Sequence, residues 1–206
     1  MKILSILICT ITGREDQFDY IYKRLCEQRT NLFMKDDIEI LVLKDDCTMS
    51  VGEKRNKLIE LAKGRHICFI DDDDDIPQYY LEKIIKILKD RPDIYCIGFL
   101  GIKTTNGLNL VTFSHCPYSK EIGFKDGKFG NPINHLNPVR RDIAIKHKFP
   151  HINNGEDQEW AKKINREFRT DRDMDRAPEN YGFINTIMYH YRYNTKTTVA
   201  RKNEQQ

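Results

Sequence analysis

Residues 68–77 read CFIDDDDDIP, in which a short apolar run leads directly into five consecutive aspartates, Asp71 to Asp75. Runs of like charge usually lie in disordered tails or on solvated surfaces, and acidic residues also favour the first turn of a helix. At the end of a buried strand, by contrast, adjacent carboxylates repel one another and lose hydration unless a divalent cation lies among them. The segment therefore predicts either a solvated acidic loop that caps the next helix or a cation site that could bind a diphosphate.

Apolar runs alternate with helical patterns on both sides of this segment. Short apolar runs followed by polar or loop-forming residues predict buried strands at 3–10, 38–43, 66–70 and 94–100. Apolar residues at helical spacing predict helices around 18–25, 58–62 and 81–88. We expect Gly64 to end the second helix in a left-handed conformation, and Asp75 with Pro77 to begin the third.

The alternation of strands and helices predicts an α/β fold with a mostly parallel central sheet and helices on both faces. Ligands of such sheets bind beyond the carboxyl ends of the strands. The aspartate run, Asp45 with Asp46, and the segment 12–14 each follow a predicted strand. One edge of the sheet should therefore bring these residues together.

The chain changes character after about residue 102. Glycines and prolines divide the rest into short polar and aromatic segments, which predict hairpins and loops with one clear helix over 156–168. No low-complexity linker separates the two halves, and a length of 206 residues suits about one domain. We therefore predict a single domain over residues 1–206, made of the halves 1–102 and 103–206.

Composition limits the classes of function. The chain carries 34 Lys and Arg against 31 Asp and Glu, and this near balance gives no general reason to expect a nucleic-acid or membrane-surface partner. The six cysteines are widely spaced, so we expect reduced thiols and a cytoplasmic protein. The N-terminal sequence lacks a signal-peptide cleavage pattern, and no apolar run approaches the roughly 20 residues of a membrane-spanning helix.

Several segments follow the order found in a known family. Residues 68–77 resemble the segment that carries the Asp-x-Asp motif of family 2 glycosyltransferases. The other matching segments are 52–56 and 62–64, which resemble the helix before that motif, and 3–12 and 42–46, which resemble the first two strands. The resemblance implies the GT-A fold and transfer of a sugar from a nucleotide-diphospho-sugar. It makes 1–102 the donor-binding half and 103–206 the half that binds the acceptor and supplies the catalytic base.

The resemblance also implies roles on the donor side. Asp73 corresponds to the metal ligand, with Mn2+ or Mg2+ as the ion, and His190 is a candidate second ligand. Five aspartates permit more than one register, so Asp74 and Asp75 stay open as alternatives. The residues expected around the nucleotide are Thr10, Thr12, Arg14, Asp45 or Asp46, Arg55, Asn56, Asp71 and Asp72. Arg192 and Lys196 are expected near the diphosphate, whereas a solvated helix face is the alternative for Arg55 and Asn56.

A second acidic group lies at 154–160, which reads NGEDQEW and resembles the Glu-Asp motif of the same family. The resemblance implies that Asp157 is the base that takes a proton from the acceptor hydroxyl, and that Glu156 orients the acceptor or the loop. The alternative is an ordinary acidic first turn of a helix. His135 and Trp160 are expected on the acceptor side, although a structural hydrogen-bonding role suits His135 equally well.

These assignments predict an inverting, metal-dependent glycosyltransferase that uses a UDP-sugar and a glycan, lipid-linked or other hydroxyl acceptor. A hydroxylated nucleic-acid base or a protein side chain is an alternative acceptor. The rival functions are a metal-dependent nucleotidyltransferase and a non-catalytic module that binds a sugar or a cation. The nucleotidyltransferase would normally need a glycine-rich phosphate loop after the first strand, where the sequence has only Gly13.

Overall fold

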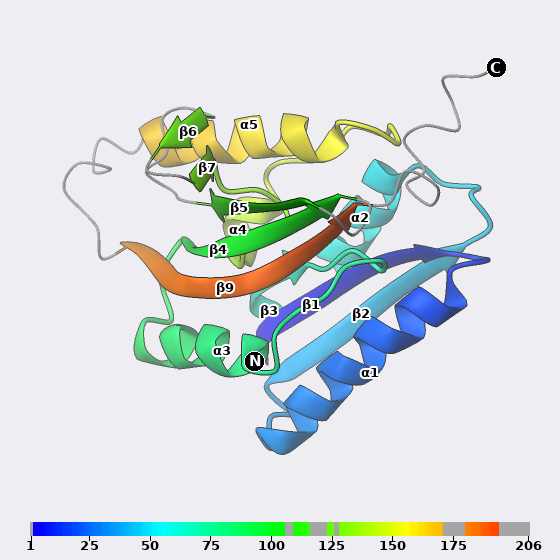
Figure 1. Ribbon diagram of the computed structural model, residues 1–206, viewed down its shortest axis with the longest axis horizontal. Coiled ribbons are helices and arrows are strands. Elements are labelled where there is room, and N and C mark those ends of the chain that lie inside the picture. The colour runs from blue at the N-terminus through cyan, green and yellow to red at the C-terminus, as the bar shows by residue number, and fades with distance from the viewer. Residues whose placement is uncertain (1, 106–108, 116–122, 126–127, 171–179, 194–206) are drawn as a thin grey trace.

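The computed structural model describes residues 2–105, 109–115, 123–125, 128–170 and 180–193. These residues form a single nine-stranded sheet with helices packed on both of its faces (Figure 1). In chain order the strands are β1 (Lys2–Ile11), β2 (Ile38–Asp45), β3 (Gly64–Phe69), β4 (Cys96–Thr105), β5 (Asn109–His115), β6 (Gly123–Lys125), β7 (Lys128–Asn131), β8 (Val139–Arg140) and β9 (Tyr181–Tyr193). The helices are α1 (Glu15–Asn31), α2 (Val51–Leu61), α3 (Tyr80–Asp90), α4 (Arg141–Ala144) and α5 (Glu156–Thr170).

The strand order is β2-β1-β3-β8-β4-β5-β7-β6, and β9 pairs with β4 in addition. β2 and β3 both run parallel to β1, so their carboxyl ends lie at one edge of the sheet. β9 is parallel to β4 and brings the end of the described chain back to the same region. This arrangement confirms the predicted α/β class.

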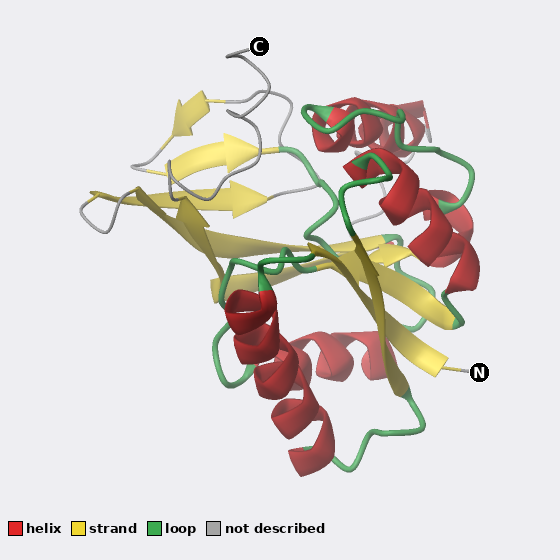
Figure 2. Cartoon of the chain, turned by 90° about the vertical axis from the view of Figure 1, so that its right-hand side faces the viewer, coloured by secondary structure: helices red, strands yellow, loops and turns green. Residues whose placement is uncertain are grey.

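An apolar core covers each face of the sheet, so β1 is buried on both sides. Alternate residues of a strand point to opposite faces, so Leu4 and Ile6 join a core with α1 and α3. Leu7 joins the other core, which contains α2, α4 and α5. Figure 2 shows the helices gathered in these two groups on either side of the strands.

The four strands predicted in the first half are all present, but they are not all neighbours. The two-residue strand β8 lies between β3 and β4 and is antiparallel to both, with Val139 opposite Ile67 on one side and Cys96 on the other. A strand this short has no periodicity that a sequence can show. The predicted helix at 156–168 is confirmed as α5.

Two local predictions are wrong. Gly64 begins β3 rather than ending α2 in a left-handed conformation; a side chain there would meet the Ser5 nitrogen at 2.5 Å, so close approach of two strands explains the glycine. Asp75 does not cap α3, which begins at Tyr80. The backbone of Asp75 pairs instead with that of His190.

The five described cysteines are free thiols, as predicted, and Cys116 lies outside the described residues. None of the helices in the described ranges is long and apolar enough to cross a membrane. The cytoplasmic location and the single domain stay predictions.

Candidate functional site

A cavity of about 740 Å³ opens where β1 and β3 end. It collects segments that are far apart in the sequence, from the loop after β1 to the beginning of α5 and the end of β9. The predicted residues that line it are Thr10, Arg14, Arg55, Asp71, Asp72, Asp73, His135, Glu156, Asp157 and Arg192. Lys196 lies outside the described residues.

The first three aspartates of the run face this cavity. Asp72 is buried and accepts a hydrogen bond from the Thr10 hydroxyl at 2.7 Å. The guanidinium of Arg14 contacts both Asp72 and Asp73, with Nη1 2.5 Å from Asp72 Oδ1 and Nη2 3.4 Å from Asp73 Oδ2. The loop after β1 and the loop after β3 are thereby joined by charge-assisted contacts.

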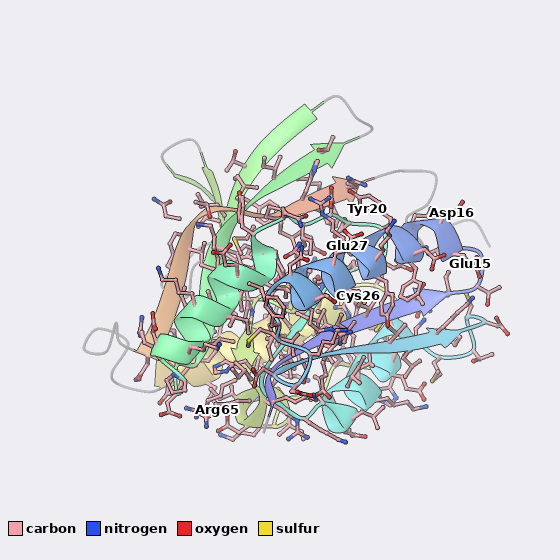
Figure 3. The ribbon with its side chains drawn as sticks, turned by 90° about the horizontal axis from the view of Figure 1, so that it is seen from below. Glu15, Asp16, Tyr20, Cys26, Glu27 and Arg65 are labelled. Carbon is pink, nitrogen blue, oxygen red and sulfur yellow. The ribbon has the colours of Figure 1, made fainter. Side chains whose placement is uncertain are left out.

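The last two aspartates serve as anchors for β9. Asp74 is 1% exposed; its Oδ2 accepts from the Tyr189 hydroxyl at 2.8 Å and its Oδ1 from the Arg192 backbone N–H at 2.8 Å. Asp75 pairs with the Arg192 side chain, with Arg24 at 3.3 Å and with the Tyr20 hydroxyl at 3.2 Å. Figure 3 shows Tyr20 on α1, between Asp16 and Cys26 along the helix.

Burial and like charge shape the electrostatics of the run. Burial raises the pKa of Asp73 to about 6; the charges of Asp71 and Asp72 add to the rise and Arg14 opposes it. Burial likewise raises the pKa of Asp74 well above its usual range. Burial also tends to raise the pKa of Asp71, but the facing His135 and Arg55 lower it more, and the net pKa lies below its usual range.

The carboxylates suit a hard divalent cation, although they do not form a complete cage. Within the described residues, no group of three or more His, Cys, Asp or Glu side chains could hold a metal ion. Mg2+ commonly takes one or two carboxylates and completes its shell with substrate phosphates and water. Asp73 fits this type of ligand because it faces the cavity among other carboxylates whose charges raise its pKa.

His190 does not line the cavity. Its imidazole Nε2 is hydrogen-bonded to the Thr104 hydroxyl on the neighbouring strand β4. The prediction of His190 as a second metal ligand therefore has no geometric support, because its ring is engaged within the sheet.

Arg55 connects the two acidic constellations. Its Nη2 lies 3.2 Å from Asp71 Oδ1, and its Nη1 lies 3.2 Å from Glu156 Oε1. The guanidinium is buried, with its central carbon 5.4 Å from the ring centres of both Phe69 and Phe149. A solvated helix face is therefore wrong for Arg55, since ionic and aromatic contacts enclose it.

Asn56 and Trp160 take structural positions instead of the predicted ones. The side-chain amide of Asn56 makes two hydrogen bonds to the backbone of Phe149: its Nδ2 donates to the carbonyl and its Oδ1 accepts from the N–H, each at 2.9 Å. Trp160 is buried, stacks on Phe149 at 4.8 Å and donates its indole N–H to the His147 carbonyl. Neither residue lines the cavity. Both bond instead to the backbone of the segment 147–149, which precedes α5.

The alternatives Asp45 and Asp46 are distinguished by their partners. Asp45 accepts from Lys54 Nζ at 2.6 Å and from the Met49 N–H at 2.8 Å, so its pKa lies below its usual range although burial opposes this. Asp46 is exposed and accepts a hydrogen bond from the Thr12 hydroxyl. Thus Asp45 is held within the protein, whereas Asp46 lies in the open loop with Thr12.

Asp157 and His135 also line the cavity. Asp157, in the first turn of α5, keeps its side chain 32% exposed. His135 lies between the two acidic groups: its Nε2 is 3.4 Å from Asp71 Oδ2, and its Nδ1 is 3.8 Å from Asp157 Oδ2. Residues separated by more than eighty positions in the sequence thus meet through one imidazole ring.

The structure adds residues that the sequence did not single out. Lys54 is buried at the cavity wall and also bonds to the Thr10 carbonyl at 3.3 Å. Phe113 and His115, on β5, also line the cavity, and burial lowers the pKa of His115 to about 3. Lys54 lay within the matched segment 52–56 and could have been found there, whereas Phe113 and His115 lie in a region without a recognisable pattern.

Comparison with known proteins identifies the family. A sequence model described as glycosyl transferase family 2 matches residues 33–148, which is more than half of the chain and includes the aspartate run. The chain belongs to glycosyl transferase family 2. Asp157 lies outside the matched range.

This family 2 chain is similar in sequence to TuaG of Bacillus subtilis, which is named as a teichuronic acid biosynthesis glycosyltransferase. The two are 29% identical over 82 residues, which is 40% of this chain and 32% of TuaG. Solved structures of S. aureus TarS are similar in fold. TarS in complex with UDP-GlcNAc has a TM-score of 0.63 at 14% identity and covers 98% of this chain and 61% of its own; TarS in complex with UDP has a TM-score of 0.60 at 15% identity and covers 94% and 61%.

These likenesses confirm the predicted GT-A type of α/β fold. The chain spans about a third of TuaG and about three fifths of the TarS structures. Family membership favours the glycosyltransferase prediction over a nucleotidyltransferase or a non-catalytic module.

Proposed function

We propose that the chain transfers a sugar from a UDP-sugar to an acceptor hydroxyl with inversion at the anomeric carbon. The observation that carries this proposal is that Asp71 to Asp73 and Asp157, from separate parts of the sequence, face one cavity across His135. In this proposal the diphosphate and its cation bind at Asp71 to Asp73, and the acceptor approaches Asp157, whose side chain is 32% exposed.

The chemistry is a single displacement. The acceptor oxygen forms a bond to the anomeric carbon while the bond from that carbon to the diphosphate oxygen breaks, and the bonding electron pair leaves with UDP. Asp157 takes the proton of the attacking hydroxyl. Arg55 positions this base indirectly, because its ion pairs hold Glu156 beside Asp71.

Asp73 would hold the Mn2+ or Mg2+ ion, which supplies positive charge to neutralise the diphosphate leaving group. Arg14 lies 3.4 Å from Asp73, and Arg192 also lines the cavity, so both add positive charge to it. The UDP part of the proposal rests on the TarS structures, which hold UDP and UDP-GlcNAc. The acceptor is proposed to be a hydroxyl of a glycan or glycoconjugate.

A donor panel tests the proposal. The purified chain is incubated with UDP-glucose, UDP-galactose, UDP-GlcNAc and UDP-GalNAc, and UDP release is measured with Mn2+, with Mg2+ and with a chelator. We expect one donor to be preferred and the chelator to abolish release. UDP release from none of the donors, or full release in the chelator, would contradict the proposal.

The base is tested by Asp157→Asn, with Glu159→Gln as the matched control. Glu159 lies in the first turn of the same helix but pairs with Lys162 at the surface. Loss of a general base typically costs about 10²- to 10⁴-fold in rate, so transfer to an acceptor should fall by that range in Asp157→Asn and stay near the original rate in Glu159→Gln. Equal activity of the two variants would remove Asp157 from this role.

A further inference from the structure

Gly52 lies in the first turn of α2, where helix stability alone would favour alanine over glycine. The residue is buried, and a β-carbon built on it would overlap the Pro150 carbonyl oxygen and lie 2.9 Å from the carbonyl carbon. The same β-carbon would lie 3.5 Å from the Cβ of Glu156. The absence of a side chain at Gly52 is therefore required by the close approach of the segment before α5, and not by the helix.

This close approach lets the N-terminus of α2 bind that segment. The backbone N–H of Gly52 donates to the Ile152 carbonyl at 3.2 Å, and the N–H of Val51 donates to Asn153 Oδ1 at 3.0 Å. The first N–H groups of an α-helix have no partner within the helix. Residues 152 and 153 supply two of the missing acceptors, so they are fastened to α2 by hydrogen bonds.

Of the two partners, α2 is the more firmly held. Its buried Lys54 bonds to Asp45 at 2.6 Å and to the Thr10 carbonyl at 3.3 Å, which ties the helix to the ends of β2 and β1. Residues 151–154, by contrast, are exposed. Exposed segments shift at a lower cost than buried contacts, so α2 sets the position of the segment.

The segment leads directly into the acidic first turn of α5. Asn154 and Gly155 are the two residues between Asn153 and Glu156, and Asp157 follows. A side chain at position 52 would push away both Pro150 and Glu156, which lie on either side of the fastened residues. The displacement would therefore reach Asp157.

We infer that Gly52 is a positioning residue for sugar transfer. By having no side chain, it allows α2, which is tied to the donor side, to set where Asp157 stands relative to the aspartate run. This inference rests on the proposed function, in which Asp157 is the base. A catalytic group misplaced by about 1 Å can cost about 100-fold in rate.

The test compares Gly52→Ala with Gly64→Ala. Gly64 is a matched control, since a β-carbon there would also meet backbone, 2.5 Å from the Ser5 nitrogen, but at the end of β3 away from the aspartates. Calorimetry with UDP and Mn2+ gives the Kd for UDP, and release of UDP from the best donor of the panel gives the rate, with water in place of the acceptor hydroxyl.

In Gly52→Ala the rate of UDP release should fall by about 100-fold while the Kd for UDP stays near the original value. In Gly64→Ala the melting temperature should fall while the rate per folded molecule is kept. An unchanged rate in Gly52→Ala, or an equal loss of rate and of UDP affinity, would overturn the inference.

A second pair of variants removes the attachment without creating a clash, which covers the case in which Gly52→Ala does not fold. Asn153→Ala removes the acceptor of the Val51 N–H, whereas Asn153→Asp keeps an oxygen at the same place. We expect UDP release to slow in Asn153→Ala and to recover in Asn153→Asp. Equal rates in these two variants would overturn the inference.

Hydrogen exchange distinguishes this inference from the proposed function, because it needs no turnover. Exchange of the backbone amides is followed by mass spectrometry in peptides that cover residues 148–158, without substrate. The exchange should be faster in Gly52→Ala and in Asn153→Ala than in the original chain and in Gly64→Ala. Unchanged exchange in both variants would overturn the inference, whether or not the chain releases UDP.

Discussion

Asp71 to Asp73 and Asp74 to Asp75 are adjacent in the chain and chemically identical, yet they occupy different environments. The first three line the cavity, where Arg14, Arg55 and His135 face them. The last two are turned toward β9 and α1, where hydroxyl, backbone and guanidinium donors hold them. The difference shows that an acidic run can divide its residues between binding and support.

The supporting pair also positions the binding three. The Tyr189 hydroxyl donates to Asp74 and accepts from the backbone N–H of Asp71 at 3.1 Å. A buried tyrosine thus joins the carboxylate at the end of the run to the peptide at its beginning. The loop has a defined shape because both of its ends are tied to β9.

Asp73→Asn is the strongest test of the binding group. Removing this carboxylate should lower kcat/KM by about 100-fold or more, since charge neutralisation at the leaving group contributes several kcal/mol. The melting temperature should hold or rise, because the raised pKa of Asp73 means that its ionised form is disfavoured in the folded state. Asp142→Asn, a change in a surface pair with Arg140, is the control. Activity within a few-fold of the original would place the essential carboxylate elsewhere in the run.

Asp74→Ala tests the supporting group. The substitution leaves the buried Tyr189 hydroxyl and the Arg192 N–H without their acceptor, which should lower the free energy of unfolding by about 1–3 kcal/mol. Asp74→Asn keeps one acceptor oxygen and should lose less. Urea unfolding of the two variants measures the difference, and equal losses would show that volume rather than hydrogen bonding matters here.

His66 lies near the start of β3, the strand that leads into the aspartate run. Burial raises the pKa of Asp73 and Asp74, but it lowers the pKa of His66 to about 4, because burial disfavours the charged form of each group. The unfolded chain binds a proton near pH 6.5, which the folded state resists, so stability should fall as pH drops from about 6.5 toward 4. Relative to His66→Gln, the original chain should lose about 1 kcal/mol between about pH 7 and pH 5.5. Unfolding curves for both proteins across this range give the difference, and a pH-independent difference would contradict the burial effect.

Asp75→Asn should have the smallest effect. Its partners Arg192 and Arg24 lie partly in solvent, and ion pairs of this kind contribute about 0–1 kcal/mol. The stability lost in Asp75→Asn should be smaller in high salt, because dissolved ions screen the ion pairs of the original chain. A loss as large as that of Asp74→Ala would mean that the two anchors act as one unit.

Much of the donor side could be predicted from sequence because its signals are local. The strands β1 to β4 are apolar runs, and Asp71 to Asp73 follow β3 directly. β8 and β9 could not be predicted in the same way, because β8 has two residues and the sequence pattern after residue 102 shows no strand at β9. The pairing of β9 with β4 turns His190 toward Thr104.

The misplaced residues share a cause. Short motifs predict binding roles for Asn56 and Trp160, but an amide or an indole N–H donates to a backbone carbonyl as readily as to a ligand. Their partners are supplied by the segment 147–149, which for Asn56 lies 93 positions away. Local spacing carries no information about a contact at such a distance.

The sequence alone determined that this protein has an α/β sheet, that acidic groups follow β3 and begin α5, and that the chain resembles family 2 glycosyltransferases. Periodicity and motif order depend on residues that are close together in the chain, so they can be recognised in the sequence alone. Tertiary structure decided which aspartates face the cavity, because Tyr189 and Arg192, 115 and 118 positions after Asp74, capture that carboxylate. It also brought His135 between Asp71 and Asp157, which lie far apart in the sequence, because the fold places the segment before β8 beside the end of β3.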